Sequence, residues 1–225
     1  MAPYTRLAAI YDRRAAAEDQ LSAGAYNLVI GLCLLWGFLL TTVIVNATSR
    51  DSMQHLGLAG ALAGLTAAIS GAYLFHHSSR PLVSFIGHNL VIVPMALAVS
   101  LAVHGSHPDA VYAAIRATAF VSLLMLAFAT LAPGWFRAIG TTITVALAAL
   151  VAVELIESLL LGIHHDLLDW AVAAVLCGYI GLDWARANAA PRTLDNAIDC
   201  AAEIYVDIVV LFLRVLRVLS PRNTP

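Results

Sequence analysis

The chain has 225 residues, of which 61% are hydrophobic and 12% are charged, and its formal net charge is −2. Soluble proteins carry about 25% charged residues, so this composition excludes an ordinary soluble domain and predicts an integral membrane protein. The chain has no lysine, so every fixed cation is an arginine, and the arginines form none of the clusters that nucleic-acid-binding proteins use. We therefore expect the lipid bilayer, and no nucleic acid, as a partner.

Seven long apolar segments follow one another along the chain. A membrane-spanning helix needs about 20 predominantly apolar residues, and the segments cover 25–45, 54–75, 82–104, 108–130, 138–162, 165–184 and 198–219. Their apolar residues are continuous rather than alternating, which excludes a transmembrane β-barrel. The sequence predicts an all-α integral membrane protein with a seven-helix transmembrane domain in 25–219, a cytoplasmic N-terminal segment in 1–24 and a short tail in 220–225.

The arginines predict the orientation of this bundle. Residues 1–24 lack the apolar stretch of a signal peptide, and the arginine distribution favours a cytoplasmic N-terminus. The inner side then receives Arg6, Arg13, Arg14, Arg80, Arg137, Arg186 and Arg192. The outer loops receive only Arg50, whereas Arg217 and Arg222 disagree with this orientation unless the last helix does not fully cross. The all-Arg, Ala-rich composition indicates a bacterial plasma membrane.

Three charged residues share one depth in the outer half of the predicted bundle. Arg116 lies about eight residues into the fourth span, or roughly 12 Å from its outer end. Glu154 and Glu157 lie about eight and five residues before the outer end of the fifth span. Because a short turn joins these two spans, we predict an Arg116–Glu154 or Arg116–Glu157 ion pair, which is either structural or part of an ion path.

Two aspartates mark the inner half of the bundle. Asp183 lies at the inner end of the sixth span, and Asp207 lies about eight to ten residues into the seventh. Two carboxylates in one partly dry site cannot both ionise cheaply, so such a pair titrates as a unit. Carboxylate oxygens are also the ligands that Ca²⁺ prefers. We therefore expect Asp183 and Asp207 to form a pH sensor with a transient calcium site, although Asp183 alone could cap its helix in water.

The last span carries acidic residues at every fourth position, and these are Asp195, Asp199, Glu203 and Asp207. At 100° per residue they climb a slanting stripe about 120° wide. We expect Asp195 and Asp199 to be first-turn acids in water, where the helix dipole favours them. Glu203 and Asp207 lie too deep for this explanation, so the stripe predicts a central helix whose polar face is buried by other helices. Glu203 is then an auxiliary acid with no assigned role.

Histidine and arginine supply candidate basic partners for the aspartates. Most histidines lie at span boundaries, where we expect them in water. His88 lies about six residues into the third span, near the depth of Asp207, and could exchange protons with it. His77 and Arg80 lie at the inner end of the second hairpin and could reach the mouth of the aspartate site as a latch.

No catalytic signature is present in the sequence, which lacks G-x-S-x-G, H-E-x-x-H and Walker motifs. The three cysteines lie in or beside apolar runs without metal-ligand spacing, and we expect Cys33, Cys177 and Cys200 to be core residues. We therefore expect a protein that is not an enzyme, that needs no cofactor and for which calcium is a transported ion.

Two stretches near the end of the chain resemble the Bax inhibitor-1 family, also called the transmembrane Bax inhibitor motif family. "YIGLDWARA" contains Asp183 and resembles the ending of the family's sixth span. "AEIYVDIVVLFLRVLRVLS" contains Asp207 and resembles its last helix. The resemblance implies a seven-helix bundle with the last helix central and a pH-sensitive calcium-leak channel. It also implies that Asp183 and Asp207 are the paired aspartates that sense pH and close the pore.

The sequence departs from the family pattern at several positions. Leu182 stands where a tyrosine commonly precedes the aspartate, Val210 replaces a frequent asparagine, and Glu203 adds an acid. The family's basic latch near the end of the second span corresponds to "HHSSRP", where Arg80 is the nearest candidate.

Three functions are compatible with these residues. The first is a calcium leak gated by the Asp183–Asp207 pair. The second is a non-conducting membrane regulator that binds another membrane protein through small-residue faces such as 57–64, with the protein partner unknown. The third is a proton-coupled cation transporter, which would show counter-transport where a leak would not.

Overall fold

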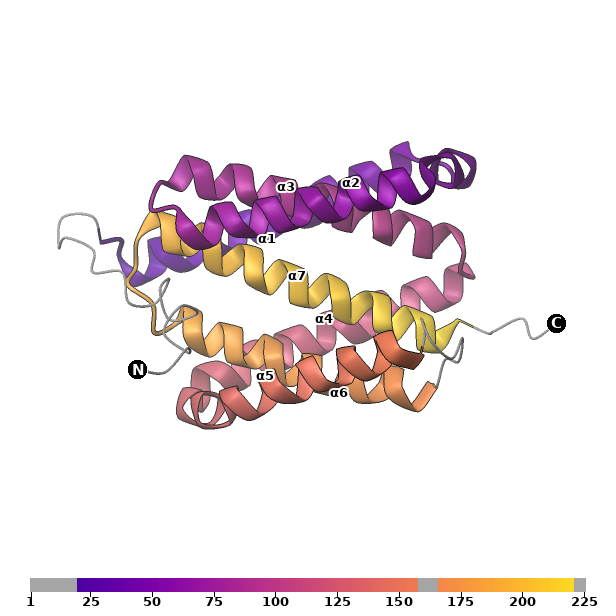
Figure 1. The fold of residues 1–225 in the computed structure, drawn as a ribbon. Helices are drawn as coiled ribbons and strands as arrows, with labels where there is room; N and C mark the ends of the chain where they lie inside the picture. The colour runs from indigo at the N-terminus through magenta and orange to yellow at the C-terminus, as the bar shows by residue number, and fades with distance from the viewer. Residues whose placement is uncertain (1–19, 158–165, 221–225) are drawn as a thin grey trace. The chain divides into compact units, whose positions relative to one another are not determined.

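The computed structural model describes residues 20–157 and 166–220, and these are folded into seven α-helices (Figure 1). The helices are α1 (Ala23–Ala47), α2 (Arg50–His77), α3 (Pro81–His104), α4 (Pro108–Leu131), α5 (Pro133–Ile156), α6 (Asp166–Ala187) and α7 (Leu194–Leu219). Each helix coincides with one predicted span, so the all-α prediction is confirmed. The segment 1–19, residues 158–162 of the fifth predicted span and residues 221–225 lie outside the described residues.

The helices α1 to α6 are long and apolar enough to cross a membrane. The last helix, α7, has 26 residues, or about 39 Å at 1.5 Å per residue. That length also exceeds the roughly 30 Å of a bilayer's hydrocarbon core. What sets α7 apart is its charge, because four acidic residues and two arginines lie along it. The helices and their composition together identify an integral membrane protein.

Proline and glycine set several of the helix boundaries. Pro81, Pro108 and Pro133 are the first residues of α3, α4 and α5. Proline is well suited there, because the first N–H groups of a helix have no partner within it. Within α2, Gly57 has a φ of 50° and interrupts the helical backbone, a conformation that glycine adopts without steric penalty. The part of α2 that could span a membrane begins at this glycine.

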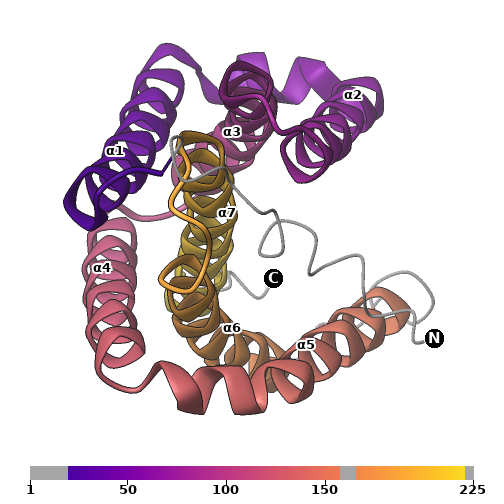
Figure 2. The same ribbon diagram turned by 90° about the vertical axis from the view of Figure 1, so that its left-hand side faces the viewer.

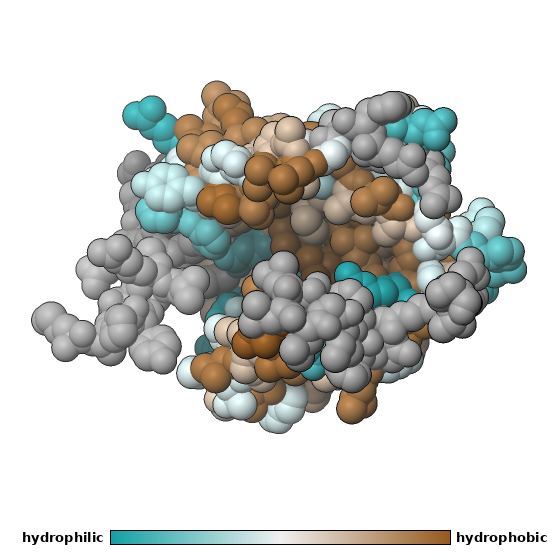
Figure 3. Space-filling model, turned by 45° about the vertical axis from the view of Figure 1, so that its right-hand side comes forward, coloured by the Kyte–Doolittle hydropathy of each residue, from teal (hydrophilic) through white to brown (hydrophobic). Residues whose placement is uncertain are grey.

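Large apolar side chains lie on the outward faces of the helices. Leu58, Leu131 and Leu167 are 76%, 84% and 81% exposed, and apolar residues cover much of the face drawn in Figure 3. Soluble monomers rarely expose apolar patches larger than a few hundred Å². These faces are therefore the surfaces that lipid acyl chains solvate.

Contacts divide the chain into two compact units, and the first unit combines α1, α2 and α3 with the first half of α7. Its described residues are 20–104 and 186–206. Within it, α3 packs against both α1 and α2 (Figure 2). The helices α2 and α3 meet at Gly71 and Gly87, where a Cβ on either glycine would come within 2.5 or 2.6 Å of the other's carbonyl oxygen. Only glycine allows two backbones to approach so closely.

The second unit combines α4, α5 and most of α6 with the second half of α7. Its described residues are 105–157, 166–185 and 207–220. Its larger core cluster joins α6 to α7 and consists of Val172, Ala173, Leu176, Ile180 and Leu211. A smaller cluster joins α6 to α4 and α5 and consists of Ala129, Phe136, Leu182 and Ala185. Within this unit, α6 is thus held by all three of its neighbours.

The last helix is the element that both units share. Its residues up to Val206 pack within the first unit, and its residues from Asp207 onward pack within the second. Ala201, Ala202 and Ile204 of its first half are fully buried, and Leu216 of its second half is 1% exposed. Each unit closes around one half of α7, which confirms the prediction that the last helix is central.

Candidate functional site

The two aspartates predicted to form the pH sensor both belong to the second unit. Asp183 lies one turn before the end of α6 and is 4% exposed. Asp207 lies halfway along α7 and is half-buried. The structure therefore places both in one unit, on two helices that pack together. Direct pairing of their carboxyl groups stays a prediction.

Apolar side chains surround both aspartates along their helices. Leu182, the neighbour of Asp183, belongs to the cluster around Phe136. Ile208, the neighbour of Asp207, packs against the core between α6 and α7. Ionisable groups among apolar helices are costly, and they usually pair with one another or line an ion pathway. This cost is the physical reason to keep Asp183 and Asp207 as the candidate site, and their role stays a prediction.

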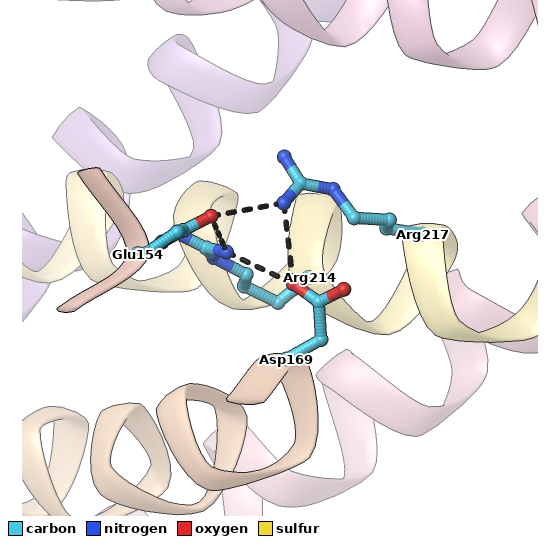
Figure 4. Close-up of polar contacts among 4 residues, drawn as sticks. All are labelled: Glu154, Asp169, Arg214 and Arg217. Carbon is cyan, nitrogen blue, oxygen red and sulfur yellow. Dashed lines mark hydrogen bonds and ion pairs between the residues drawn. The ribbon is translucent and has the colours of Figure 1, made fainter. Parts of the chain in front are cut away.

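Near the other end of the second unit, a network of four charged residues joins α5, α6 and α7 (Figure 4). The Arg214 guanidinium donates to both carboxylate oxygens of Glu154, with Nη1 2.5 Å from Oε1, and Nη1 also lies 3.0 Å from Oδ1 of Asp169. Arg217 Nη1 donates to the same two carboxylates at 3.1 and 3.2 Å. Two cations thus face two anions, and the bidentate Arg214–Glu154 contact is the geometry in which such pairs are strongest.

This network replaces the ion pair that the sequence predicted for Arg116. Arg116 is exposed on α4, and in the described part of the chain no ion pair joins it to Glu154 or Glu157. Glu157 lies half-buried just after α5, and its Oε2 has no hydrogen-bond partner among the described residues. The prediction failed because it matched the depths of neighbouring helices without knowing which face each helix turns inward.

Asp169 was the residue that the sequence argument missed. It lies at the start of α6 and is only 5% exposed. A signal was nevertheless available, since Arg214 lies two helical turns after Asp207 on the same face of the last span. The start of the sixth span and the end of the seventh meet when the two helices run antiparallel, so an acid at the first could have been matched to an arginine at the second.

The acidic residues at the start of α7 are buried within the first unit. Asp195 is 5% exposed and accepts a hydrogen bond from Ser84 Oγ of α3 at 2.8 Å. Asp199 is fully buried. The prediction that both are first-turn acids in water is therefore wrong. The beginning of α7 is enclosed by the helices of the first unit, which shield its acids from water.

Glu203, to which the sequence gave no role, lies beside a histidine of α2. His76 Nδ1 is 3.7 Å from Glu203 Oε1, and the side chains are 33% and 17% exposed. Their chain neighbours also meet, because Phe75 of α2 and Ala202 of α7 share a buried cluster. The contact of α2 with α7 thus places an apolar cluster, to which Ala72 of α2 and Val206 of α7 also contribute, next to a polar pair.

The candidate basic partners occupy three different environments. His88 is fully buried in the first unit, with Nε2 3.4 Å from the Cys33 carbonyl oxygen. His77 is exposed and stacks on Tyr73 with ring centroids 4.2 Å apart. Arg80 is exposed between α2 and α3. Proton exchange of His88 with Asp207 and a latch at Arg80 or His77 stay predictions.

Tyr205, two residues before Asp207, contacts two other helices of the first unit. Tyr205 Oη lies 2.6 Å from Thr41 Oγ1, and the tyrosine ring lies edge-on to His88 with centroids 5.7 Å apart. Gly37 leaves room for the ring, since a Cβ there would come within 2.8 Å of it. Tyr205 thereby ties α7 to α1 and α3, a role that the sequence did not reveal.

The remaining candidate ligands form no metal centre in the described part of the chain. No group of three or more His, Cys, Asp or Glu side chains there is arranged to hold a metal ion. Cys33 and Cys200 are buried, Cys177 is half-buried, and all three are free thiols. A transient calcium contact at Asp183 and Asp207 alone is a different kind of site and stays a prediction.

One comparison with known proteins gives a match over nearly the whole chain. A family model described as "Inhibitor of apoptosis-promoting Bax1" matches residues 18–224. No curated protein and no solved structure matches the chain. The matched range contains all seven helices, both aspartates of the predicted sensor and the network at the end of α7.

Proposed function

The chain belongs to the Bax inhibitor-1 family, and from this premise we propose that it is a pH-sensitive calcium-leak channel gated by Asp183 and Asp207. We propose further that it resides in a bacterial plasma membrane with its N-terminus in the cytoplasm. The observation that carries the proposal is the burial of Asp183, which is 4% exposed in a unit that also contains the half-buried Asp207.

The proposed gate depends on the cost of charge in apolar surroundings. When both carboxyl groups are ionised, they repel each other and attract a cation from the path. When they share a proton, the repulsion falls and the two helices that carry them can approach. Because Ca²⁺ takes carboxylate oxygens as ligands, protons and calcium compete for the same two residues, so calcium flux depends on pH.

Calcium flux into liposomes tests this proposal directly. The purified protein is reconstituted with a calcium indicator inside, and flux is recorded between pH 5 and 8 for the wild type, Asp183→Asn and Asp207→Asn. We expect wild-type flux to change with pH and each variant to lose that dependence, because neither amide can titrate. The matched control is Asp109→Asn, whose carboxylate is 91% exposed at the start of α4, and it should behave as the wild type.

The same experiment separates the three functions. A normal pH response in both variants rejects the gating pair. Calcium flux that requires a proton gradient and moves protons in the opposite direction identifies a transporter instead of a leak. Wild-type protein that is folded by circular dichroism and passes no cation at any pH favours the non-conducting regulator.

A further inference from the structure

We propose that Arg116 of α4 binds the phosphate group of an anionic membrane phospholipid on the lipid-facing side of the second unit. The guanidinium holds two phosphate oxygens, and the acyl chains of the lipid lie along the exposed apolar side chains of α4. The proposal concerns the surface of one helix and does not depend on what the bundle conducts.

Arg116 lies on the face of α4 that points away from the core of the second unit. The inward face carries Val121, Met125 and Ala129, which pack against the two core clusters of this unit. At 100° per residue, Arg116 projects about 180° from Met125, the middle of these three positions. The exposure of Arg116 agrees with this projection.

The side chains around Arg116 on this face are large, apolar and exposed. Tyr112 and Phe120 lie one turn to either side of Arg116, and Leu123 lies nearly two turns after it. All three are more than half exposed, which identifies the face as one that lipid solvates. Arg116 is therefore a charge on a lipid-facing surface, whereas charged residues within spans usually face the bundle interior.

The depth of Arg116 places its guanidinium near phospholipid headgroups. Arg116 is eight residues after Pro108, the first residue of α4, or about 12 Å along the axis. Side chains of a helix lean toward its N-terminus, so the guanidinium points toward the membrane surface at which α4 begins. Long arginine side chains extend in this way to bring their charge to the interface while the stem stays among apolar groups.

No protein group neutralises Arg116 in the described part of the chain. Among residues 20–157 and 166–220, no hydrogen bond or ion pair joins its guanidinium to another residue. Asp109 lies about two turns nearer the start of α4 on the same face, but its carboxylate lies 3.5 Å from Nδ1 of His107. Arg214 and Arg217, by contrast, each contact two carboxylates. The counter-ion of Arg116 therefore comes from outside the described chain.

A phospholipid fits this requirement better than a second copy of the chain does. Among the acids whose side chains the structure describes, Asp51 and Asp109 are exposed, and both lie at helix starts. The described acids deeper in the helices are buried or half-buried. In the described residues, a second copy thus offers no exposed carboxylate at the depth of Arg116, whereas every phospholipid carries a phosphate at the membrane interface.

The chemistry of the contact favours an anionic headgroup. A guanidinium presents a planar fork of N–H donors that matches two phosphate oxygens. In a zwitterionic headgroup, an ammonium balances the phosphate charge, whereas in phosphatidylglycerol nothing does. One arginine near the membrane surface strengthens the binding of anionic lipid about fivefold.

Native mass spectrometry of the detergent-purified protein tests the site. Phosphatidylglycerol or phosphatidylcholine with identical acyl chains is added in steps, and the Kd of the first bound lipid is measured. We expect Arg116→Gln to bind phosphatidylglycerol about fivefold more weakly than the wild type, with a smaller change for phosphatidylcholine. Arg116→Lys keeps the charge without the fork and should lie between the two.

Arg137→Gln is the matched control, because it removes another exposed arginine from the same unit. Arg137 lies only four residues after the start of α5, or about 6 Å along the axis, where water reaches it. This variant should bind phosphatidylglycerol as the wild type does.

Thermal unfolding gives a second readout. Phosphatidylglycerol should raise the unfolding temperature of the wild type more than that of Arg116→Gln, since a ligand of the folded state stabilises it. Equal affinities of the wild type and Arg116→Gln for phosphatidylglycerol overturn the site. Displacement of the lipid by inorganic phosphate overturns the lipid as its ligand in favour of a soluble phosphate. A wild-type dimer that Arg116→Gln converts to monomers overturns it in favour of a second copy.

Discussion

At the scale of single residues, the fixed position of Tyr205 shows how the motif before Asp207 contributes to packing. Thr41 donates its hydroxyl proton to the Gly37 carbonyl at 2.8 Å, so the tyrosine donates to Thr41 across 2.6 Å. The ring fills the space that Gly37 leaves open. Tyr205 therefore anchors α7 to α1, and it stands two residues before Asp207, the aspartate of the proposed gate.

Removal of the Tyr205 hydroxyl should weaken the fold modestly. We expect Tyr205→Phe to lower stability by about 0.5–1.5 kcal/mol, the net worth of one hydrogen bond. Tyr205→Ala should cost about 3–5 kcal/mol, because it leaves a cavity over Gly37. Thermal unfolding in detergent measures both. Tyr112→Phe is the control, since Tyr112 is 65% exposed on α4, and a Tyr205→Phe midpoint equal to that control would contradict the anchor.

At the scale of helices, the charged network holds the ends of α5, α6 and α7 together within the second unit. Arg214 is 14% exposed and Arg217 is 50% exposed, although both contact Glu154 and Asp169. Loss of a buried partner leaves uncompensated charge, whereas an exposed partner is replaced by water. The two arginines should therefore differ in their contribution to stability.

We expect Arg214→Gln to destabilise the second unit by about 3 kcal/mol and Arg217→Gln by less than about 1 kcal/mol. The comparison uses thermal unfolding of the two variants at the same ionic strength. Glu154→Gln should resemble Arg214→Gln, since it breaks the same bidentate contact. Equal effects of the two arginine substitutions would show that the network is solvated and contributes little.

The crossing of α2 and α3 gives a prediction of the same kind for the first unit. A Cβ on Gly87 would lie 2.6 Å from the Gly71 carbonyl oxygen, which is backbone and cannot rotate away. Gly87→Ala should therefore separate the helices and cost about 1–3 kcal/mol. Gly31→Ala is the matched control in α1, where nothing lies within 4 Å of the added atom. It should be neutral or stabilise by up to about 1 kcal/mol, and a similar gain from Gly87→Ala would contradict the close crossing.

At the scale of the whole molecule, the sequence predicted the helices well because lipid imposes a simple rule on them. Every backbone group within a bilayer must be satisfied inside its own segment, so apolar length alone locates a helix. The central position of α7 was also predictable, since Glu203 and Asp207 lie too deep in it to reach water. The family resemblance, carried by the segments around Asp183 and Asp207, is confirmed by the family match over 18–224.

The polar contacts were less predictable, because helical depth does not determine which face of a helix meets its neighbours. Arg116 and Glu154 have matching depths, yet Glu154 is bound by Arg214 and Arg217. Asp195 and Asp199 lie at a helix start, yet the first unit encloses them. The partner of Glu203 is His76, the neighbour of the His77 that had been considered as a latch. Each outcome depends on the rotation of a helix about its own axis, which apolar packing determines.

The orientation of the bundle can be argued further from the network on α7. Arg217 conflicts with the predicted orientation only if it is counted as an arginine of the outer loops. In the structure, Arg217 contacts Glu154 and Asp169 from the last turn of α7. The positive-inside rule counts arginines in the loops near the span ends, so Arg217 does not count against the predicted orientation. Arg80 and Arg192 lie in loops and still indicate the inner side, so we expect the α2–α3 connection to face the cytoplasm.

Labelling of introduced cysteines tests this orientation. In a background with the three native cysteines changed to alanine, Ser79→Cys, His107→Cys and Leu219→Cys each offer one thiol at an exposed position. An impermeant maleimide applied to intact cells should label His107→Cys and Leu219→Cys, and it should label Ser79→Cys only after the cells are permeabilised. Labelling of Ser79→Cys alone on intact cells would show that the orientation is the opposite of the predicted one. Protection of both Ser79→Cys and Leu219→Cys would show that α7 does not fully cross the membrane, because its two ends would then face the same side.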